Sequence, residues 1–156
     1  MSGGSHEKSQ KDPYRECPYS HYSGNQPDCS EWVKVLEQAV AEIGESSVLV
    51  AHSLGCLCVA HWAACTSLTI KGALLVAPPN PEEADFPSEA TGFSPVPLGS
   101  FGFPSIVVAS SNDPYGSLEF ARACASGWGS RFVHIGAAGH INSESGLGDW
   151  PEGWVL

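Results

Sequence analysis

Residues 47–55 read SVLVAHSLG, and this stretch decides the predicted fold. Its first six residues, 47–52, form a short and almost continuous apolar run, which is typical of a strand covered on both faces. Ser53 follows this run directly, and the small-residue-rich stretch 54–66 after it predicts a helix. The sequence therefore predicts a strand, a sharp turn and a helix, with a serine at the turn.

Other strands and helices are predicted on both sides of this stretch. Three further apolar runs predict strands at residues 73–77, 105–110 and 131–135, and helical spacing of apolar residues predicts helices at residues 31–43 and 118–126. Asp28 or Ser30 would cap the first of these helices. Strands that alternate with helices in this way predict an α/β domain with a mostly parallel sheet and helices on both faces.

Three polar residues, Ser53, Asp113 and His140, each come just after a predicted strand. Each has an ordinary explanation by itself; Asp113, for example, precedes a proline and would suit a turn. Their combination is more informative, because ligands of parallel sheets bind where the carboxyl ends of the strands meet. His140 would accept the Ser53 proton as general base, and Asp113 would fix the tautomer of the imidazole. The sequence predicts a catalytic triad.

The residues around Ser53 fit a nucleophile elbow, whose general form is Gly-x-Ser-x-Gly. Ala51 and Gly55 are small enough for the sharp turn, although Ala51 departs from the strict glycine. The backbone N–H of Leu54, at the start of the predicted helix, would donate to a developing oxyanion. His52 leaves the turn in another direction than its neighbour, so we expect it to pack or hydrogen-bond structurally.

Four other titratable residues compete for the acid and base roles. His61 falls inside a predicted helix and His134 inside a predicted strand, so we expect both to be structural. Glu144 and Asp149 follow His140 in the chain, which makes them poor candidates for the triad acid. None of the four displaces the predicted triad.

The overall charge of the chain argues against some classes of binding partner. The formal net charge is −10, so the surface repels phosphate backbones and anionic lipid headgroups, and neither a nucleic acid nor a membrane is expected as partner. No apolar run approaches the roughly 20 residues that span a bilayer. Residues 1–26 lack the apolar segment of a signal peptide. We therefore expect a cytoplasmic protein.

The six cysteines are expected to form neither a disulfide framework nor a metal site. Four lie in apolar stretches and are predicted to be reduced, buried thiols: Cys56, Cys58, Cys65 and Cys124. A helix would point Cys56 and Cys58 to roughly opposite sides, which disfavours a shared metal ion. The sequence assigns no role to Cys17 or Cys29.

The chain divides into two parts by composition. Residues 1–27 are polar, turn-rich and without periodicity, and they predict a disordered or irregular N-terminal segment. Residues 28–156 carry all the predicted strands and helices and are expected to form one domain.

Several segments resemble the small serine hydrolases related to retinoblastoma-binding protein nine, a group of compact α/β-hydrolases. The matching segments are EWVKVLEQAV (31–40), LVAHSLGCLCVAHWAA (49–64), GALLVAPP (72–79), FPSIVVASSNDPY (103–115) and WGSRFVHIGAAGHINSESGLGDWPEG (128–153). The resemblance implies a three-layer, α/β-hydrolase-like (flavodoxin-like) fold and a Ser-Asp-His triad. It also implies hydrolysis of small ester-like acyl substrates, with no metal and no organic cofactor.

The chain departs from that family at its front. Family members open with an apolar strand and a Gly-rich loop that supplies a second oxyanion N–H, and residues 1–27 contain no such strand. We therefore expect the opening strand to be missing, which leaves two hypotheses. The first is a carboxylesterase-like serine hydrolase, and the second is a catalytically impaired hydrolase-like domain that binds a protein partner. No motif specifies the natural substrate or the oligomeric state.

Overall fold

The computed structural model describes residues 26–156. In chain order the elements are α1 (Cys29–Ile43), β1 (Val48–His52), α2 (Leu54–Ala63), β2 (Gly72–Val76), β3 (Ser105–Ala109), α3 (Leu118–Trp128), β4 (Arg131–His134) and the 3-10 helices η1 (Ser143–Ser145) and η2 (Pro151–Val155). The predictions for residues 1–25, namely the irregular segment, the missing opening strand and Cys17, lie outside the described residues.

The four strands form one parallel sheet in the order β1-β2-β3-β4. Its register aligns Ala51, Leu75, Val107 and Phe132 in one row across the sheet. All four strands therefore end at the same edge, and the loops that follow them meet there. The predicted parallel sheet and all four predicted strands are confirmed, with bounds that shift by one residue at some ends.

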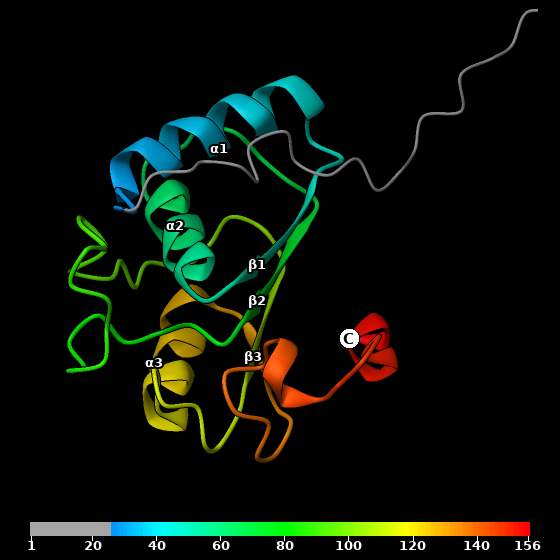
Figure 1. Cartoon of the computed structure of the whole chain (residues 1–156). Helices are drawn as coiled ribbons and strands as arrows, with labels where there is room; N and C mark the ends of the chain where they lie inside the picture. Colours follow the sequence, from blue (N-terminus) through cyan, green and yellow to red (C-terminus); the bar gives the residue numbers. More distant parts are fainter. Residues whose placement is uncertain (1–25) are drawn as a thin grey trace, which may run out of the picture.

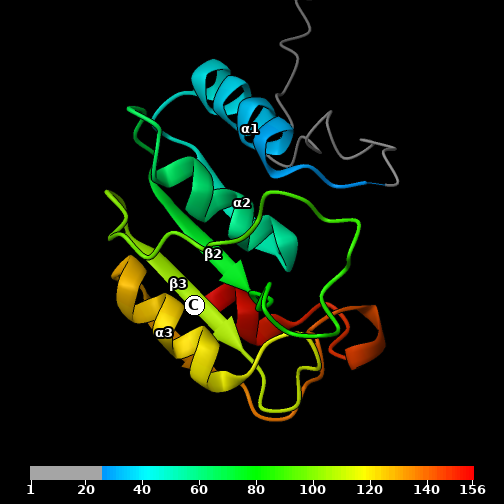
Figure 2. The same cartoon turned by 90° about the vertical axis from the view of Figure 1, so that its left-hand side faces the viewer.

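The two faces of the sheet carry different kinds of helix. α1, α2 and α3 all pack on one face, on the left in Figure 1 and toward the viewer in Figure 2. The segment 135–156, which contains η1 and η2, packs on the opposite face. Both faces thus carry helical segments, as predicted, but the α-helices are all on one of them.

The main hydrophobic core lies under the α-helices. Trp62 of α2 and Leu75 of β2 are 0% exposed, and Trp128 of α3 is 1% exposed. Each buried indole has an acceptor, since Trp62 donates to the Glu37 carboxylate and Trp128 to the Pro97 carbonyl. Burial of large apolar side chains in a close-packed layer, with their few polar atoms hydrogen-bonded, accounts for most of the stability of such a domain.

The opposite face is open over β1. Val48 and Val50 point to this face and are 59% and 73% exposed. β1 is also an edge strand of the described sheet, because it pairs only with β2. Val76 and Val108, in contrast, point to the same face but are buried under the segment 135–156.

The structure corrects one cysteine prediction. Cys56, Cys58 and Cys124 are buried as predicted, and burial raises the pKa of Cys58 and of Cys124 to about 12. Cys65 is exposed instead, because α2 ends at Ala63 and Cys65 lies in the turn that follows. Cys29, to which the sequence assigned no role, is buried beside Cys58 in a small apolar cluster.

Candidate active site

Ser53 lies in the sharp turn between β1 and α2. Its backbone angles are φ 55° and ψ −125°, a strained conformation for a residue with a side chain, which costs about 1–3 kcal/mol. The Ser53 N–H donates to the Val76 carbonyl at 3.0 Å, which ties the turn to the neighbouring strand. A Cβ at Gly55 would lie 3.4 Å from the Cβ of Ala51, in ordinary van der Waals contact, so these two small residues face each other across the turn. This is the geometry of a nucleophile elbow.

Leu54 is the first residue of α2, directly after Ser53. Backbone N–H groups in the first turn of a helix have no acceptor within the helix, and the helix dipole makes this end partly positive. The Leu54 amide therefore has the chemistry of an oxyanion donor beside the serine. In the described residues, the structure assigns no second donor to such a hole.

The structure brings Ser53, Asp113 and His140 together from three separate loops. His140 Nε2 lies 2.8 Å from Ser53 Oγ, and His140 Nδ1 lies 2.9 Å from both carboxylate oxygens of Asp113. A carboxylate accepts hydrogen bonds, so Nδ1 carries the proton and Nε2 can accept from the serine hydroxyl. The side chains of Asp113 and His140 are 3% and 10% exposed. This arrangement can move a proton from Ser53 to His140.

The Asp113 loop and the His140 loop are joined by a small polar network. Ser110, which is 1% exposed, accepts a hydrogen bond from the Ala138 N–H (2.8 Å) and donates to Asn112 Oδ1 (2.9 Å). Asn112 Oδ1 also accepts from the Gly139 N–H at 2.7 Å. We call Ser110 and Asn112 the loop clasp. It fixes the main chain just before His140 relative to the loop that carries Asp113.

Two rings contact the His140 imidazole edge-on. The Tyr115 and His52 ring centroids each lie 4.7 Å from that of His140, at interplanar angles of 65° and 60°. The Tyr115 N–H donates to Asp113 Oδ1 at 2.9 Å, so Tyr115 also helps to hold the carboxylate. His52 makes the structural hydrogen bond that was expected of it, to the backbone carbonyl of His140 (2.7 Å).

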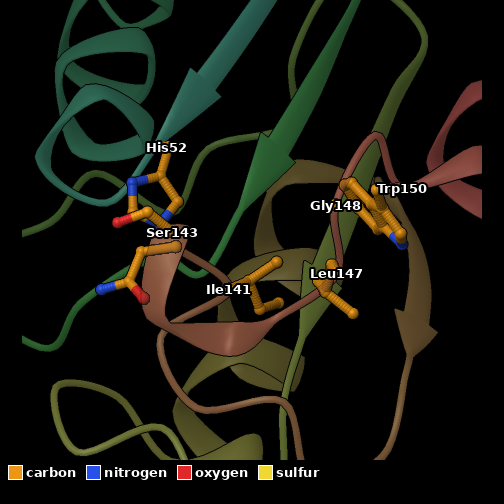
Figure 3. Close-up of a pocket in the computed structure, with 7 residues that line it drawn as sticks. His52, Ile141, Ser143, Leu147, Gly148 and Trp150 are labelled. Atoms are coloured by element: carbon orange, nitrogen blue, oxygen red, sulfur yellow. The ribbon is translucent and has the colours of Figure 1, made fainter.

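An open hollow of about 640 Å³ lies beside the His140 loop. Its lining residues, which are both polar and apolar, are His52, Ile141, Asn142, Ser143, Leu147, Gly148 and Trp150. Figure 3 shows His52 at one end of this hollow and Trp150 at the other. A second hollow on the Asp113 side reaches His140 and Tyr115. His140 lines the second hollow, the neighbouring residues His52 and Ile141 line the first, and Ser53 lines neither.

Two further findings concern residues 26–156. No group of three or more His, Cys, Asp or Glu side chains in this range is arranged to hold a metal ion. No helix in this part of the chain has the length and apolar character needed to cross a membrane.

Sequence comparison identifies the family. The model of the serine hydrolase family matches residues 9–156. The chain belongs to the serine hydrolase family. No curated protein matches the sequence.

Solved structures agree with this serine hydrolase assignment. A protein described as a YdeN-like hydrolase, from Pectobacterium atrosepticum, is 31% identical, with a TM-score of 0.68 over 82% of this chain and 66% of that protein. The ydeN gene product of Bacillus subtilis is 20% identical (TM-score 0.62; 84% and 77% covered). A Bacillus cereus carboxylesterase is 18% identical (TM-score 0.52; 80% and 57% covered). The last two show likeness of fold alone, and this chain spans less than two thirds of the first and third proteins.

Sequence reasoning located Ser53, Asp113 and His140 but missed the residues that hold them. The loop clasp was not predicted, although the polar run Ser110-Ser111-Asn112 directly before Asp113 was visible. A buried polar residue at the end of an apolar strand is a usable signal, because such a residue needs hydrogen-bond partners. The contacts of Tyr115 and His52 with His140 have no comparable local signal.

Proposed function

We propose that this serine hydrolase cleaves small ester-like substrates through an acyl-enzyme intermediate. The observation that carries the proposal is the line of short contacts from Ser53 Oγ through the His140 imidazole to the Asp113 carboxylate. Ser53 is the nucleophile, His140 the general base and acid, and Asp113 the residue that orients His140 and offsets its charge.

The reaction has two steps. In the first, Ser53 Oγ attacks the acyl carbon while its proton moves to His140 Nε2, and the Leu54 N–H donates to the oxyanion. The C–O bond to the alcohol then breaks, and His140 returns the proton to the leaving oxygen. In the second step, water attacks the acyl-Ser53 ester, with His140 again taking and returning a proton, and the carboxylic acid is released.

The position of Ser53 supports this assignment on physical grounds. A strained φ at a non-glycine residue persists only where the surroundings hold it, and such residues concentrate at functional sites. The turn places the hydroxyl at the carboxyl edge of the sheet, next to the free amides of α2.

The test is hydrolysis of p-nitrophenyl acetate and p-nitrophenyl butyrate by the wild-type protein and by Ser53→Ala. The wild type should release an initial burst of p-nitrophenolate, at most one per protein molecule, followed by steady turnover. Ser53→Ala should lose the burst and at least about 10⁴-fold of the turnover. Equal rates for the two proteins would contradict the proposal.

Protein binding is a second candidate function, and one observation favours it. In the described part of the chain β1 has a free edge, and Val48 and Val50 beside that edge are exposed. A free strand edge can take up a strand of another chain. A well-folded wild-type protein that gives neither burst nor turnover would favour this candidate over the hydrolase.

A further inference from the structure

His52, the last residue of β1, directly precedes the proposed nucleophile but is not itself one of the three proposed catalytic residues. Its Nε2–H donates to the backbone carbonyl of His140 at 2.7 Å, across 88 residues of sequence. Figure 3 shows its ring at the end of β1, beside the loop that follows His140. This hydrogen bond connects the strand that carries Ser53 with the main chain of the proposed base.

The connection matters because of how the His140 loop is held. The loop clasp fixes this loop relative to Asp113, but its hydrogen bonds in the described structure do not reach the Ser53 turn. Among the described residues, the polar contacts between residues 48–55 and the His140 loop are the His52 bond and the Ser53–His140 bond itself. Apart from the Ser53–His140 contact, the His52 bond is therefore the described hydrogen bond that ties the strand carrying Ser53 to this loop.

The main chain after His140 also needs external support. Ile141 has φ 50°, which is unfavourable for a β-branched residue and is maintained only by surrounding contacts. The His52 bond acts on the peptide group between His140 and Ile141, since the carbonyl of His140 belongs to it. Without this bond, we expect the peptide to relax and to carry the imidazole away from Ser53.

We propose that His52 is a positioning residue, which holds the His140 main chain where Nε2 meets Ser53 Oγ. This proposal rests on the proposed function of Ser53 and His140. It goes beyond a structural role, because it predicts an effect on the rate of the chemical step rather than on the stability of the fold. A displacement of about 1 Å at such a contact can reduce a rate by about 10²-fold.

Three variants separate positioning from packing. His52→Phe keeps a ring but removes the donor, and His52→Gln keeps an N–H donor at a similar reach. His61 provides a matched control, because its Nε2–H also donates to a backbone carbonyl, that of Phe93 at 3.1 Å, away from the triad. His61→Phe therefore removes the same kind of bond without touching the proposed site.

The measurement is the rate constant for covalent modification by a fluorophosphonate at saturating concentration, together with Tm. His52→Phe should react about 10- to 100-fold more slowly than wild type, with Tm nearly unchanged because His52 is exposed. His52→Gln should react within about threefold of wild type, and His61→Phe should lower Tm while keeping the wild-type rate. A wild-type rate for His52→Phe, or an equal loss in His52→Gln, would overturn the proposal.

A second measurement tests the positioning role of His52 even if the wild-type protein does not react with the fluorophosphonate. The Nδ1 proton of His140, shared with Asp113, is observable by NMR, and its signal can be assigned by its loss in Asp113→Asn. We expect this proton to exchange with water faster in His52→Phe than in wild type, and at the wild-type rate in His52→Gln. An unreactive wild type would end the proposed function, whereas an unchanged exchange rate in His52→Phe would end the positioning role.

Discussion

Trp62, on the helical face of the sheet, is fully buried, whereas Val50, on the opposite face, is 73% exposed. The helical face is covered by three α-helices packed on a continuous core. Within residues 26–156, the opposite face is covered over β2, β3 and β4 but not over β1, by the segment 135–156 with its two short 3-10 helices. The same sheet thus has one densely packed side and one thinly covered side.

Stability and the geometry of the candidate site depend on different faces of the sheet. The proposed base, His140, belongs to the thinly covered side, because Ile141, Leu147 and Trp150 of its segment pack there. Hydrogen bonds with Asp113, with the loop clasp and with His52 hold its side chain and the main chain on either side of it. The helical face therefore supplies most of the free energy of folding, and polar contacts on the other side supply the geometry of the site.

The sharpest test of this division changes the site and leaves the core untouched. Asp113→Asn places a neutral amide against His140 Nδ1 and permits the wrong imidazole tautomer. We expect esterase turnover to fall by roughly 10⁴-fold, as for other triads, with little change in Tm. Steady-state kinetics and thermal melting check this, and a loss below tenfold would remove Asp113 from the proposed triad.

The converse test changes the core and leaves the site untouched. Trp62→Ala removes a fully buried indole from the helical face, and we expect the free energy of unfolding to fall by about 3–5 kcal/mol. The activity of each folded molecule should be unchanged. Urea unfolding and burst titration measure the two quantities separately. A loss of burst amplitude in fully folded Trp62→Ala protein would contradict this separation of the stabilising core from the candidate site.

Ser110→Ala tests the loop clasp, which we expect to affect both the stability of the fold and the geometry of the candidate site. The substitution leaves the Ala138 N–H without its acceptor, and we expect a loss of about 1–3 kcal/mol in the free energy of unfolding. Turnover should fall as well, because the His140 loop loses its bond to Ser110 and Asn112 Oδ1 loses the hydrogen bond that Ser110 donates to it. Ser105→Ala is the matched control. Ser105 is also a buried serine, but it lies at the other end of β3, where its hydroxyl is hydrogen-bonded to that of Ser130. We expect turnover to fall in Ser110→Ala and to stay at the wild-type value in Ser105→Ala; equal losses would contradict the role of the loop clasp.

Val50→Ala should have the smallest effect. Its side chain is mostly exposed, so we expect the free energy of unfolding to change by no more than about 0.5 kcal/mol. Val107→Ala, the same substitution at a fully buried position on the helical face, should cost at least about 1.5 kcal/mol. Urea unfolding of the pair measures the asymmetry, and equal losses would show that β1 is covered in solution.

Much of the fold could be predicted because its strands are short apolar runs. Residues 47–52 and 105–110 have the hydrophobic pattern of buried parallel strands, and Ser53 follows the first at the turn. The exposure of Val48 and Val50 could not be predicted, because a continuous apolar run does not show which of its faces is covered. Coverage depends on segments far away in the chain, here 135–156.

The candidate site was predictable only in part for a related reason. Residue type, chain order and position after a strand singled out Ser53, Asp113 and His140. The contacts that hold them join residues that are distant in sequence, such as His52 with His140 and Ser110 with Ala138. The hydrophobic period carries no information on such pairs, so the supporting residues required the three-dimensional structure.

The most direct test of the central claim is covalent labelling of the wild-type protein with a fluorophosphonate, with the modified residue identified by peptide mass spectrometry. We expect a single added phosphonyl group on Ser53, absent in Ser53→Ala and added much more slowly in His140→Ala. Modification at another serine, or no modification of a well-folded wild-type protein, would contradict it.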